Sequence, residues 1–270
     1  MITAMDVEEY LSYLESYTKD GKLYTNREEG KARKLSSLKS FYDYYFKKNL
    51  IRTNPPRQVD VPKIKNKNII RLDPNEIAQL LDEAESGEKL SGRQLASHEK
   101  TKVRDVAILT LLLGTGIRVS ECVGLNLEDV DFNNGAIRII RKGGNEALIY
   151  FGDEVSQALE AYMNGSRKTA EPAAGHEEAL FISLNKTRIT TRSVERLVKK
   201  YSRLVTTVKK ITPHKLRSTF GTALYQETGD IYLVADTLGH KDVNTTKKHY
   251  AAIDEHRRRM AANVVKLRES

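Results

Sequence analysis

Six side chains in this sequence could together carry out chemistry on a phosphodiester. In chain order they are Arg118, Lys142, His214, Arg217, His240 and Tyr250. Arginine presents a planar fork of donors that matches phosphate oxygens, and it stays charged at every relevant pH. Histidine exchanges protons near neutral pH, and an activated tyrosine can act as a nucleophile. The set predicts an enzyme that cuts and rejoins DNA strands without a metal ion.

Each of these side chains would have a separate task. Two arginine forks on one scissile phosphate would neutralise the charge of a pentavalent transition state. Tyr250 needs activation, because a tyrosine with a pKa near 10 is ionised only about one part in a thousand at neutral pH. His214 is the best candidate to take that proton. Lys142 can protonate the leaving 5′ oxygen, and His240 follows a glycine that can turn the chain back to the site.

Taken singly, each residue also has an ordinary structural explanation. An arginine at a helix start is usually a surface or salt-bridge residue, and a lysine in a hairpin turn is usually solvated. A lone histidine is more often structural than catalytic, and Tyr250 alone would be an ordinary core or surface tyrosine. The joint arrangement, rather than any single residue, favours the chemical interpretation.

The elements that must hold these residues are mainly helical. Apolar spacing, proline, glycine and capping residues predict a mainly α protein with a small antiparallel β-sheet, an α+β fold. The expected elements are a helix from Pro74 through Leu81, a loop over 85–102, a helix over 103–113 ended by Gly114 and Gly116, strands over 136–140 and 147–150 joined by a turn over 143–145, a helix over 194–205, a helix capped by Thr212 and ended at Gly229, and a helix capped by Asp230 and ended near Gly239.

The chain is predicted to contain three parts. Residues 1–51 form a small helical unit, in which Leu35, Leu38 and Tyr45 belong to an apolar stripe at helical spacing. Residues 52–71 carry six Lys/Arg, one Asp and three prolines, a composition that predicts an extended basic linker rather than an ordinary surface loop. Residues 72–270 form the catalytic part.

Composition restricts the classes of partner. The formal charge of +9 and a pI of about 9.4 suit a polyanion, although many basic proteins never bind nucleic acid. No apolar run approaches the length of a membrane span, and the first residues lack the pattern of a secretory signal. Cys122 lies in an apolar helical context and is expected to be a buried, inert thiol. We therefore expect a cytoplasmic protein without a membrane partner.

Three segments resemble the tyrosine recombinase (phage integrase) family, which includes Xer-like and mobile-element integrases. They are GTGIRVSECVGL, IIRKGGNEALIYF and TPHKLRSTFGTALYQETGDIYLVADTLGHKDVNTTKKHY. The resemblance extends over residues 74–250, and the family's active-site set of Arg, Lys, His, Arg, His and Tyr maps onto the six residues named above. Glu121 resembles the family's acidic residue at that place, which orients an arginine.

The resemblance implies a 3′-phosphotyrosyl DNA intermediate that is resealed after strand exchange, with no cofactor, ATP or metal. It implies double-stranded DNA as partner, a homo-tetramer on two duplexes, and an accessory or directionality protein in some reactions. It also implies a helical core-binding domain that forms a DNA clamp with the catalytic domain, and a tail helix after Tyr250. Integration of a mobile element is the preferred role, ahead of excision, dimer resolution or inversion.

Two departures from the family pattern modify these expectations. Ser218 stands where many members have a second histidine, so local DNA contacts are expected to differ. Residues 1–50 resemble only the latter half of the core-binding domain, which suggests a truncated chain that lacks one or two leading helices. The alternatives are a type IB topoisomerase-like nicking-closing enzyme, a non-catalytic DNA-binding relic of the fold, and an RNA- or phosphopeptide-binding protein.

Overall fold

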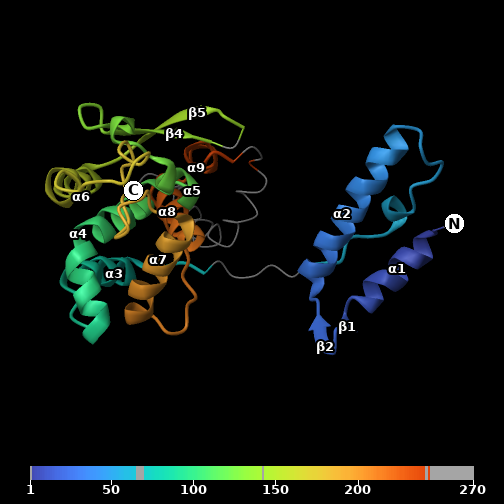
Figure 1. Cartoon of the computed structure of the whole chain (residues 1–270). Helices are drawn as coiled ribbons and strands as arrows, with labels where there is room; N and C mark the ends of the chain where they lie inside the picture. The colour runs from blue at the N-terminus through green and yellow to red at the C-terminus, as the bar shows by residue number, and fades with distance from the viewer. Residues whose placement is uncertain (1, 65–69, 142, 241–242, 244–270) are drawn as a thin grey trace, which may run out of the picture. The chain divides into compact units, whose positions relative to one another are not determined.

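The computed structural model describes residues 2–64, 70–141, 143–240 and 243 (Figure 1). The chain divides into two compact units, Met1–Lys67 and Asn68–Ser270. The described part is mainly helical with two small antiparallel sheets, which confirms the predicted α+β class. Among the described helices, none is both long and apolar enough to span a bilayer.

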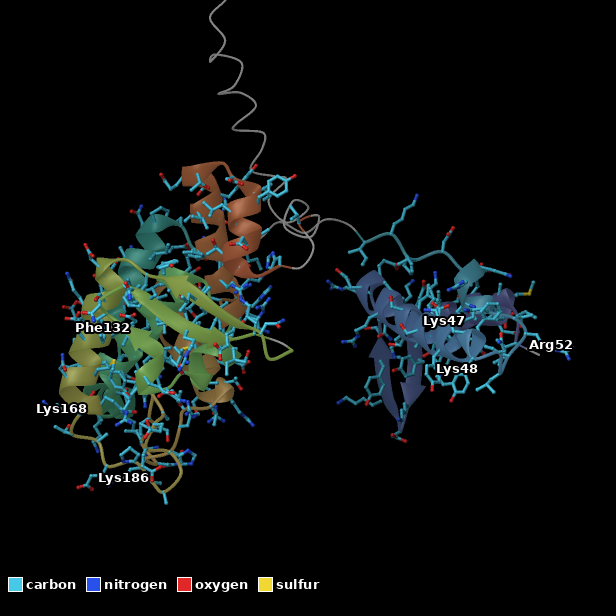
Figure 2. The ribbon with its side chains drawn as sticks, turned by 90° about the horizontal axis from the view of Figure 1, so that it is seen from above. Lys47, Lys48, Arg52, Phe132, Lys168 and Lys186 are labelled. Carbon is cyan, nitrogen blue, oxygen red and sulfur yellow. The ribbon has the colours of Figure 1, made fainter. Side chains whose placement is uncertain are left out.

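The first unit consists of two helices, a hairpin and a short 3-10 turn. Its elements are α1 (Ala4–Tyr13), β1 (Ser16–Lys19), β2 (Lys22–Thr25), α2 (Glu28–Lys47) and η1 (Pro55–Gln58). The core joins Val7 and Leu11 of α1 to Leu35 of α2. The predicted stripe on α2 packs only at its amino-terminal part, because Phe41 is 56% exposed. Lys47, Lys48 and Arg52 add positive charge to this unit (Figure 2).

The predicted linker starts too early. Pro55 and Pro56 are buried in η1, which packs against both α1 and α2, and Val59 joins the core of the first unit. Lys39 also donates from Nζ to the carbonyl of Val59 at 2.7 Å. Proline fixes φ near the value of a helical turn and carries an apolar ring, so a proline pair can close a core as well as extend a linker.

The second unit is built around one long helix. Its elements are α3 (Pro74–Ser86), α4 (Gly92–Thr115), α5 (Val119–Gly124), η2 (Leu127–Asp129), β3 (Val130–Asp131), β4 (Ala136–Ile140), β5 (Glu146–Tyr150), α6 (Asp153–Tyr162), the π-type turn η3 (Met163–Arg167), α7 (Thr191–Val205), α8 (Pro213–Thr228) and α9 (Ile231–Leu238). Ile108, Leu109 and Leu111 of α4 are fully buried. Helix α4 contacts α3, α6, α7 and α8, and the sheet β3-β4-β5 lies along one side of this helical body (Figure 1).

The predicted loop over 85–102 is wrong, because α4 begins at Gly92. Most of its amino-terminal half is exposed, and three polar side chains, those of His98, Thr101 and Asp105, are buried with hydrogen-bond partners. The carboxylate of Asp105 accepts from Thr101 at 3.0 Å and from the Tyr201 hydroxyl at 3.1 Å. The ring of His98 contacts the same Tyr201 hydroxyl at 3.0 Å. Burial, followed by the charge of Asp105, raises the pKa of Tyr201, so the hydroxyl remains a donor and ties α7 to α4.

Candidate active site

A glycine turn between α4 and α5 places Arg118. Gly116 ends α4 with a positive φ of 63°, and Arg118 occupies the position before the first residue of α5. The buried carboxylate of Glu121 accepts from the backbone N–H of Arg118 at 2.7 Å and from its Nη1 at 2.9 Å. Glu121 therefore both caps the start of α5 and orients the guanidinium of Arg118, as predicted for this carboxylate. The side chain of Arg118 remains 41% exposed and accessible to a ligand.

Helix α8 presents His214 on its first turn and Arg217 on the same face one turn later. Pro213 occupies the first helical position as predicted, whereas the side chain of Thr212 makes no capping hydrogen bond. Arg217 is 6% exposed, and its Nη1 donates to the carbonyl of Gly116 at 2.5 Å. Its Nη2 donates to the carbonyl of Leu238. Arg217 thus joins the carboxyl end of α4 to that of α9.

The carboxyl end of α9 is closed by its own backbone and by three arginines. Gly239 has a left-handed backbone with φ 60°, and its N–H donates to the carbonyl of Asp236 at 2.8 Å. The N–H of His240 donates to the carbonyl of Ala235 at 2.8 Å. This leaves the next three carbonyls, those of Thr237, Leu238 and Gly239, without helical partners. They accept, in that order, from Arg141 at 3.1 Å, from Arg217, and from Arg118 at 3.4 Å.

This arrangement gathers three arginines on backbone carbonyls, and Arg118 also pairs with the Glu121 carboxylate. The partial negative charge at a helix carboxyl end favours nearby cations, and neutral carbonyls orient guanidinium groups without cancelling their charge. The pKa of His214 is lowered, first by loss of hydration and then by the positive charges of Lys215, Arg217 and Arg118. His214 therefore lies within electrostatic range of both arginines, and its neutral form, which can accept a proton, is favoured.

The sequence of residues 70–257 matches the phage integrase family. The chain belongs to this family. It is 37% identical over 218 residues to "Tyrosine recombinase XerC" of Thermodesulfovibrio yellowstonii, covering 80% of this chain and 69% of that protein. It is 29% identical over 259 residues to "Tyrosine recombinase XerD" of Oceanobacillus iheyensis, covering 90% of this chain and 83% of that protein. The chain is thus a tyrosine-type site-specific recombinase.

Solved structures support the same fold. The XerH site-specific recombinase bound to palindromic difH substrate has a TM-score of 0.72 at 22% identity, covering 97% of this chain and 72% of that one. The Tn1549 transposon integrase in complex with circular intermediate DNA has a TM-score of 0.70 at 24% identity, covering 96% and 85%. These likenesses extend over both units of this integrase family member, so the first unit is part of the shared fold.

Four of the six predicted residues lie in the described part, and the structure brings them to one place. Arg118 and Arg217 donate to neighbouring carbonyls at the end of α9, His240 follows those carbonyls directly, and His214 lies near both arginines. Lys142 and Tyr250 lie outside the described residues. Their roles stay predictions.

Sequence reasoning missed Arg141 and the packing role of Gly116. Arg141 was indistinguishable in the sequence from any solvated residue next to a hairpin turn. A Cβ at position 116 would lie 2.3 Å from Cδ1 of Phe220. The glycine is needed for packing of α8 and for a left-handed turn. Its carbonyl contacts Arg217.

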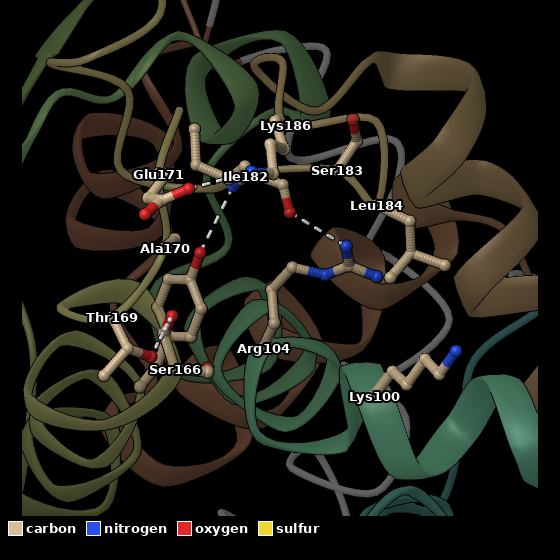
Figure 3. Close-up of a pocket in the computed structure, with 11 residues that line it drawn as sticks. Lys100, Arg104, Ser166, Thr169, Ala170, Glu171, Ile182, Ser183, Leu184 and Lys186 are labelled. Atoms are coloured by element: carbon tan, nitrogen blue, oxygen red, sulfur yellow. Dashed lines mark hydrogen bonds and ion pairs between the residues drawn. The ribbon is translucent and has the colours of Figure 1, made fainter. Parts of the chain in front are cut away.

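A separate hollow of about 260 Å³ lies between α4, η3 and the segment around Ile182 (Figure 3). Its charged lining includes Arg104, whose Nη1 donates to the carbonyl of Ile182 at 2.9 Å, and Lys186, which pairs with Glu171 at 3.1 Å. The first contact connects α4 to the segment between η3 and α7, and the second joins two parts of that segment. None of the four predicted site residues that the structure describes lines it.

Proposed function

We propose that the chain cuts and rejoins double-stranded DNA through a 3′-phosphotyrosyl intermediate, as a homo-tetramer on two duplexes. The observation that carries this proposal is the convergence of Arg118 and Arg217 on the carboxyl end of α9, next to His240. One guanidinium is buried and fixed, and the other is partly open to solvent. We propose that the two guanidinium groups together bind the scissile phosphate.

In the proposed cleavage step, the oxygen of Tyr250 attacks the scissile phosphorus. The new bond joins this oxygen to phosphorus, and the bond from phosphorus to the 5′ oxygen breaks with its electron pair on that oxygen. His214 takes the tyrosine proton, since its lowered pKa keeps it neutral at physiological pH. Lys142 gives a proton to the departing 5′ oxygen. Religation runs these transfers in reverse, so the phosphodiester energy is conserved in the protein–DNA bond.

Arg118 and Arg217 stabilise the charge that develops on the phosphate in the transition state. Glu121 limits the motion of Arg118, while the carbonyls of Gly116 and Leu238 hold Arg217 from two helices. His240 would add a hydrogen bond to the same phosphate. Such preorganised donors need no rearrangement as the reaction proceeds.

The DNA partner is supported by the charge of +9 and by the solved structures with this fold, two of which hold DNA. The catalytic unit also carries an exposed row of Arg192, Arg196, Lys199 and Arg203 along α7, which suits contacts with phosphates. We further propose a cytoplasmic location and a role in the movement of a mobile element, which fits the likeness to the Tn1549 transposon integrase.

The test uses a duplex that carries a candidate site with a nick beside the scissile phosphate, so that the short 5′-hydroxyl fragment diffuses away and traps the covalent complex. Wild type is expected to give a slower, protease-sensitive band on a denaturing gel. Tyr250→Phe should lose the band and keep DNA binding, whereas the exposed Tyr232→Phe should keep both. A band that persists in Tyr250→Phe would refute the nucleophile. Relaxation of supercoiled DNA by a monomer, without recombinants, would favour the topoisomerase-like alternative.

A further inference from the structure

Arg141 lies where the chain leaves β4 and enters the hairpin turn. Its N–H donates to the carbonyl of Asn145 at 2.8 Å, and its own carbonyl accepts from the N–H of Gly144 at 3.0 Å. Gly143 and Gly144 have positive φ values of 96° and 81°, so they supply the left-handed backbone that the predicted turn requires. The backbone of Arg141 is therefore hydrogen-bonded to Gly144 and Asn145 across the hairpin turn. Lys142, the next residue in the sequence, lies outside the described residues.

The side chain of Arg141 reaches across to α9. Its Nη2 donates to the carbonyl of Thr237 at 3.1 Å. Its guanidinium also lies against Gly239, where a Cβ would come within 2.4 Å of Nη1 and 2.5 Å of Cζ. Only a glycine at 239 leaves room for this contact without displacing the arginine. The hairpin and the carboxyl end of α9, which lie side by side in Figure 1, are thus connected through one side chain.

Burial shows that this contact is part of the folded structure rather than a surface encounter. The Nε atom of Arg141 is buried and has no acceptor among the described residues. Leaving a buried N–H without an acceptor is unfavourable, so packing and the Thr237 contact must hold the guanidinium there. Arg138 on the same strand differs: it is exposed and pairs with Asp129 at 3.0 Å.

We propose that Arg141 is a positioning residue, which fixes the β4–β5 turn to the carboxyl end of α9 and so places the proposed general acid Lys142 at the leaving 5′ oxygen. This inference rests on the proposed function. The same three carbonyls of α9 hold Arg118 and Arg217, which are proposed to hold the phosphate. Arg141 would therefore hold the acid and the phosphate-binding arginines to one common support.

The test compares two nicked substrates that differ in one atom, the bridging 5′ oxygen or a 5′ sulfur at the scissile phosphate. An alkoxide is a poor leaving group that needs a proton, because the pKa of its conjugate acid is near that of water, about 15.7. A thiolate leaves readily, because a thiol is far more acidic than an alcohol; the thiol of cysteine, for example, has a pKa of about 8.5. Sulfur therefore restores cleavage to a protein whose acid is absent or misplaced, and it does not restore a defect in phosphate binding or folding.

Single-turnover cleavage would be measured for wild type, Lys142→Ala, Arg141→Met, Arg141→Lys and the matched control Arg138→Met. Methionine keeps an unbranched stem against Gly239 but loses the donors, while lysine keeps the charge and loses the fork. We expect Arg141→Met to cleave the oxygen substrate about 10- to 100-fold more slowly than wild type, a part of the roughly 10²- to 10⁴-fold that general acid catalysis contributes, and the sulfur substrate within about 3-fold. Arg141→Lys should show the same pattern to a smaller extent, and Arg138→Met should match wild type on both substrates.

The outcomes separate this inference from the function on which it rests. Rescue of Lys142→Ala by sulfur, without rescue of either Arg141 variant, would overturn the inference and leave the proposed acid intact. Absence of rescue for Lys142→Ala would refute the acid and, with it, the role given to Arg141. Arg141 variants that cleave the oxygen substrate as fast as Arg138→Met does would also overturn the positioning role of Arg141. Measurements of DNA binding and of thermal unfolding show whether Arg141→Met is folded. If it is not, the comparison of the oxygen and sulfur substrates is made with Arg141→Lys instead.

Discussion

Replacement of Gly116 by alanine should destabilise the catalytic unit in a way that can be divided into two parts. The first is the backbone, because a left-handed conformation costs a residue with a Cβ about 1–2 kcal/mol, and φ at this position is 63°. The second is contact, because the new Cβ would lie 2.3 Å from Cδ1 of Phe220 and 3.0 Å from Cδ2 of Leu238. Carbon atoms pack at about 3.5–4.0 Å, so Phe220 must retreat by more than about 1 Å. Overpacking of this kind adds about 1–3 kcal/mol.

The expected total is a loss of about 2–5 kcal/mol in the free energy of unfolding, a large part of the stability of a typical domain. Urea unfolding followed by circular dichroism measures it, and with a slope of about 2–3 kcal/mol per molar the midpoint should fall by roughly 1–2 M. Gly124→Ala is the matched control. Gly124 lies in α5 without a positive φ, and a Cβ added there would meet no atom within 4 Å, so its replacement should be neutral or slightly stabilising.

A double-mutant cycle with Phe220→Ala isolates the contact. Truncation of the partly buried Phe220 carries its own cost, but it removes the ring that meets the new methyl group. We therefore expect a favourable coupling of about 1–2 kcal/mol between the two replacements, with the remaining cost assigned to the backbone. Wild-type stability for Gly116→Ala would refute the whole argument. A loss that is unchanged in the Phe220→Ala background would refute the contact part alone.

Three further outcomes follow from the site and its surroundings. Glu121→Gln keeps a hydrogen-bond acceptor and removes the negative charge beside Arg118. Because the side chain of Arg118 is 41% exposed and its ion pair is partly screened, the rate of single-turnover cleavage should fall only about 3- to 10-fold at saturating DNA. An unchanged rate would exclude the orienting role of Glu121. Lys215→Met removes one of the positive charges that lower the pKa of His214. In wild type the acidic limb of the cleavage–pH profile is expected below the ordinary histidine pKa of about 6.5, and in this variant it should move to higher pH. A shift to lower pH would contradict the assignment of that limb to His214. Burial raises the pKa of Cys122 to about 12, so a thiol reagent at about pH 8 should label it only after unfolding, and rapid labelling of the native protein would show that the thiol is accessible.

The sequence predicted the elements that have strong local signals. The helix that carries His214 and Arg217 ends at Gly229, and the next begins after Asp230, whose carboxylate accepts from Tyr232 and Leu233. The β4–β5 hairpin follows from its glycine turn. These signals are readable because a glycine with positive φ or a capping carboxylate acts within a few residues of the element that it ends or begins.

The hairpin β1–β2 was missed although its signal was present. Asp20 and Gly21 form its turn with φ values of 51° and 70°, and an Asp-Gly pair is a strong indicator of such a turn. Its strands are mostly exposed, so no alternation of apolar residues drew attention to them. Tyr17 and Tyr24 instead stack across the strands with their ring centroids 5.5 Å apart.

The early start of α4 and the role of Arg141 depend on partners far away in the sequence. Asp105 is buried because Tyr201 donates to it, and Arg141 is fixed because Thr237 and Gly239 accept and make room for it. A single sequence does not reveal such pairs, since a polar residue reads as exposed until its partner is known. Local patterns therefore predicted where the site residues lie along the chain, but not what holds them.

The end of α9 shows how residues from distant parts of this chain come to act on one phosphate. The carbonyls of the consecutive residues Thr237, Leu238 and Gly239 accept from arginines at the start of α5, after the end of β4 and in α8. A carboxylate in place of these carbonyls would also gather the arginines, but it would offset more of their charge; the carboxylate that contacts Arg118, Glu121, belongs to α5. Each guanidinium has five donors, so one carbonyl contact orients it and leaves its charge in place. The left-handed Gly239 then places His240 directly after the carbonyls that hold the arginines.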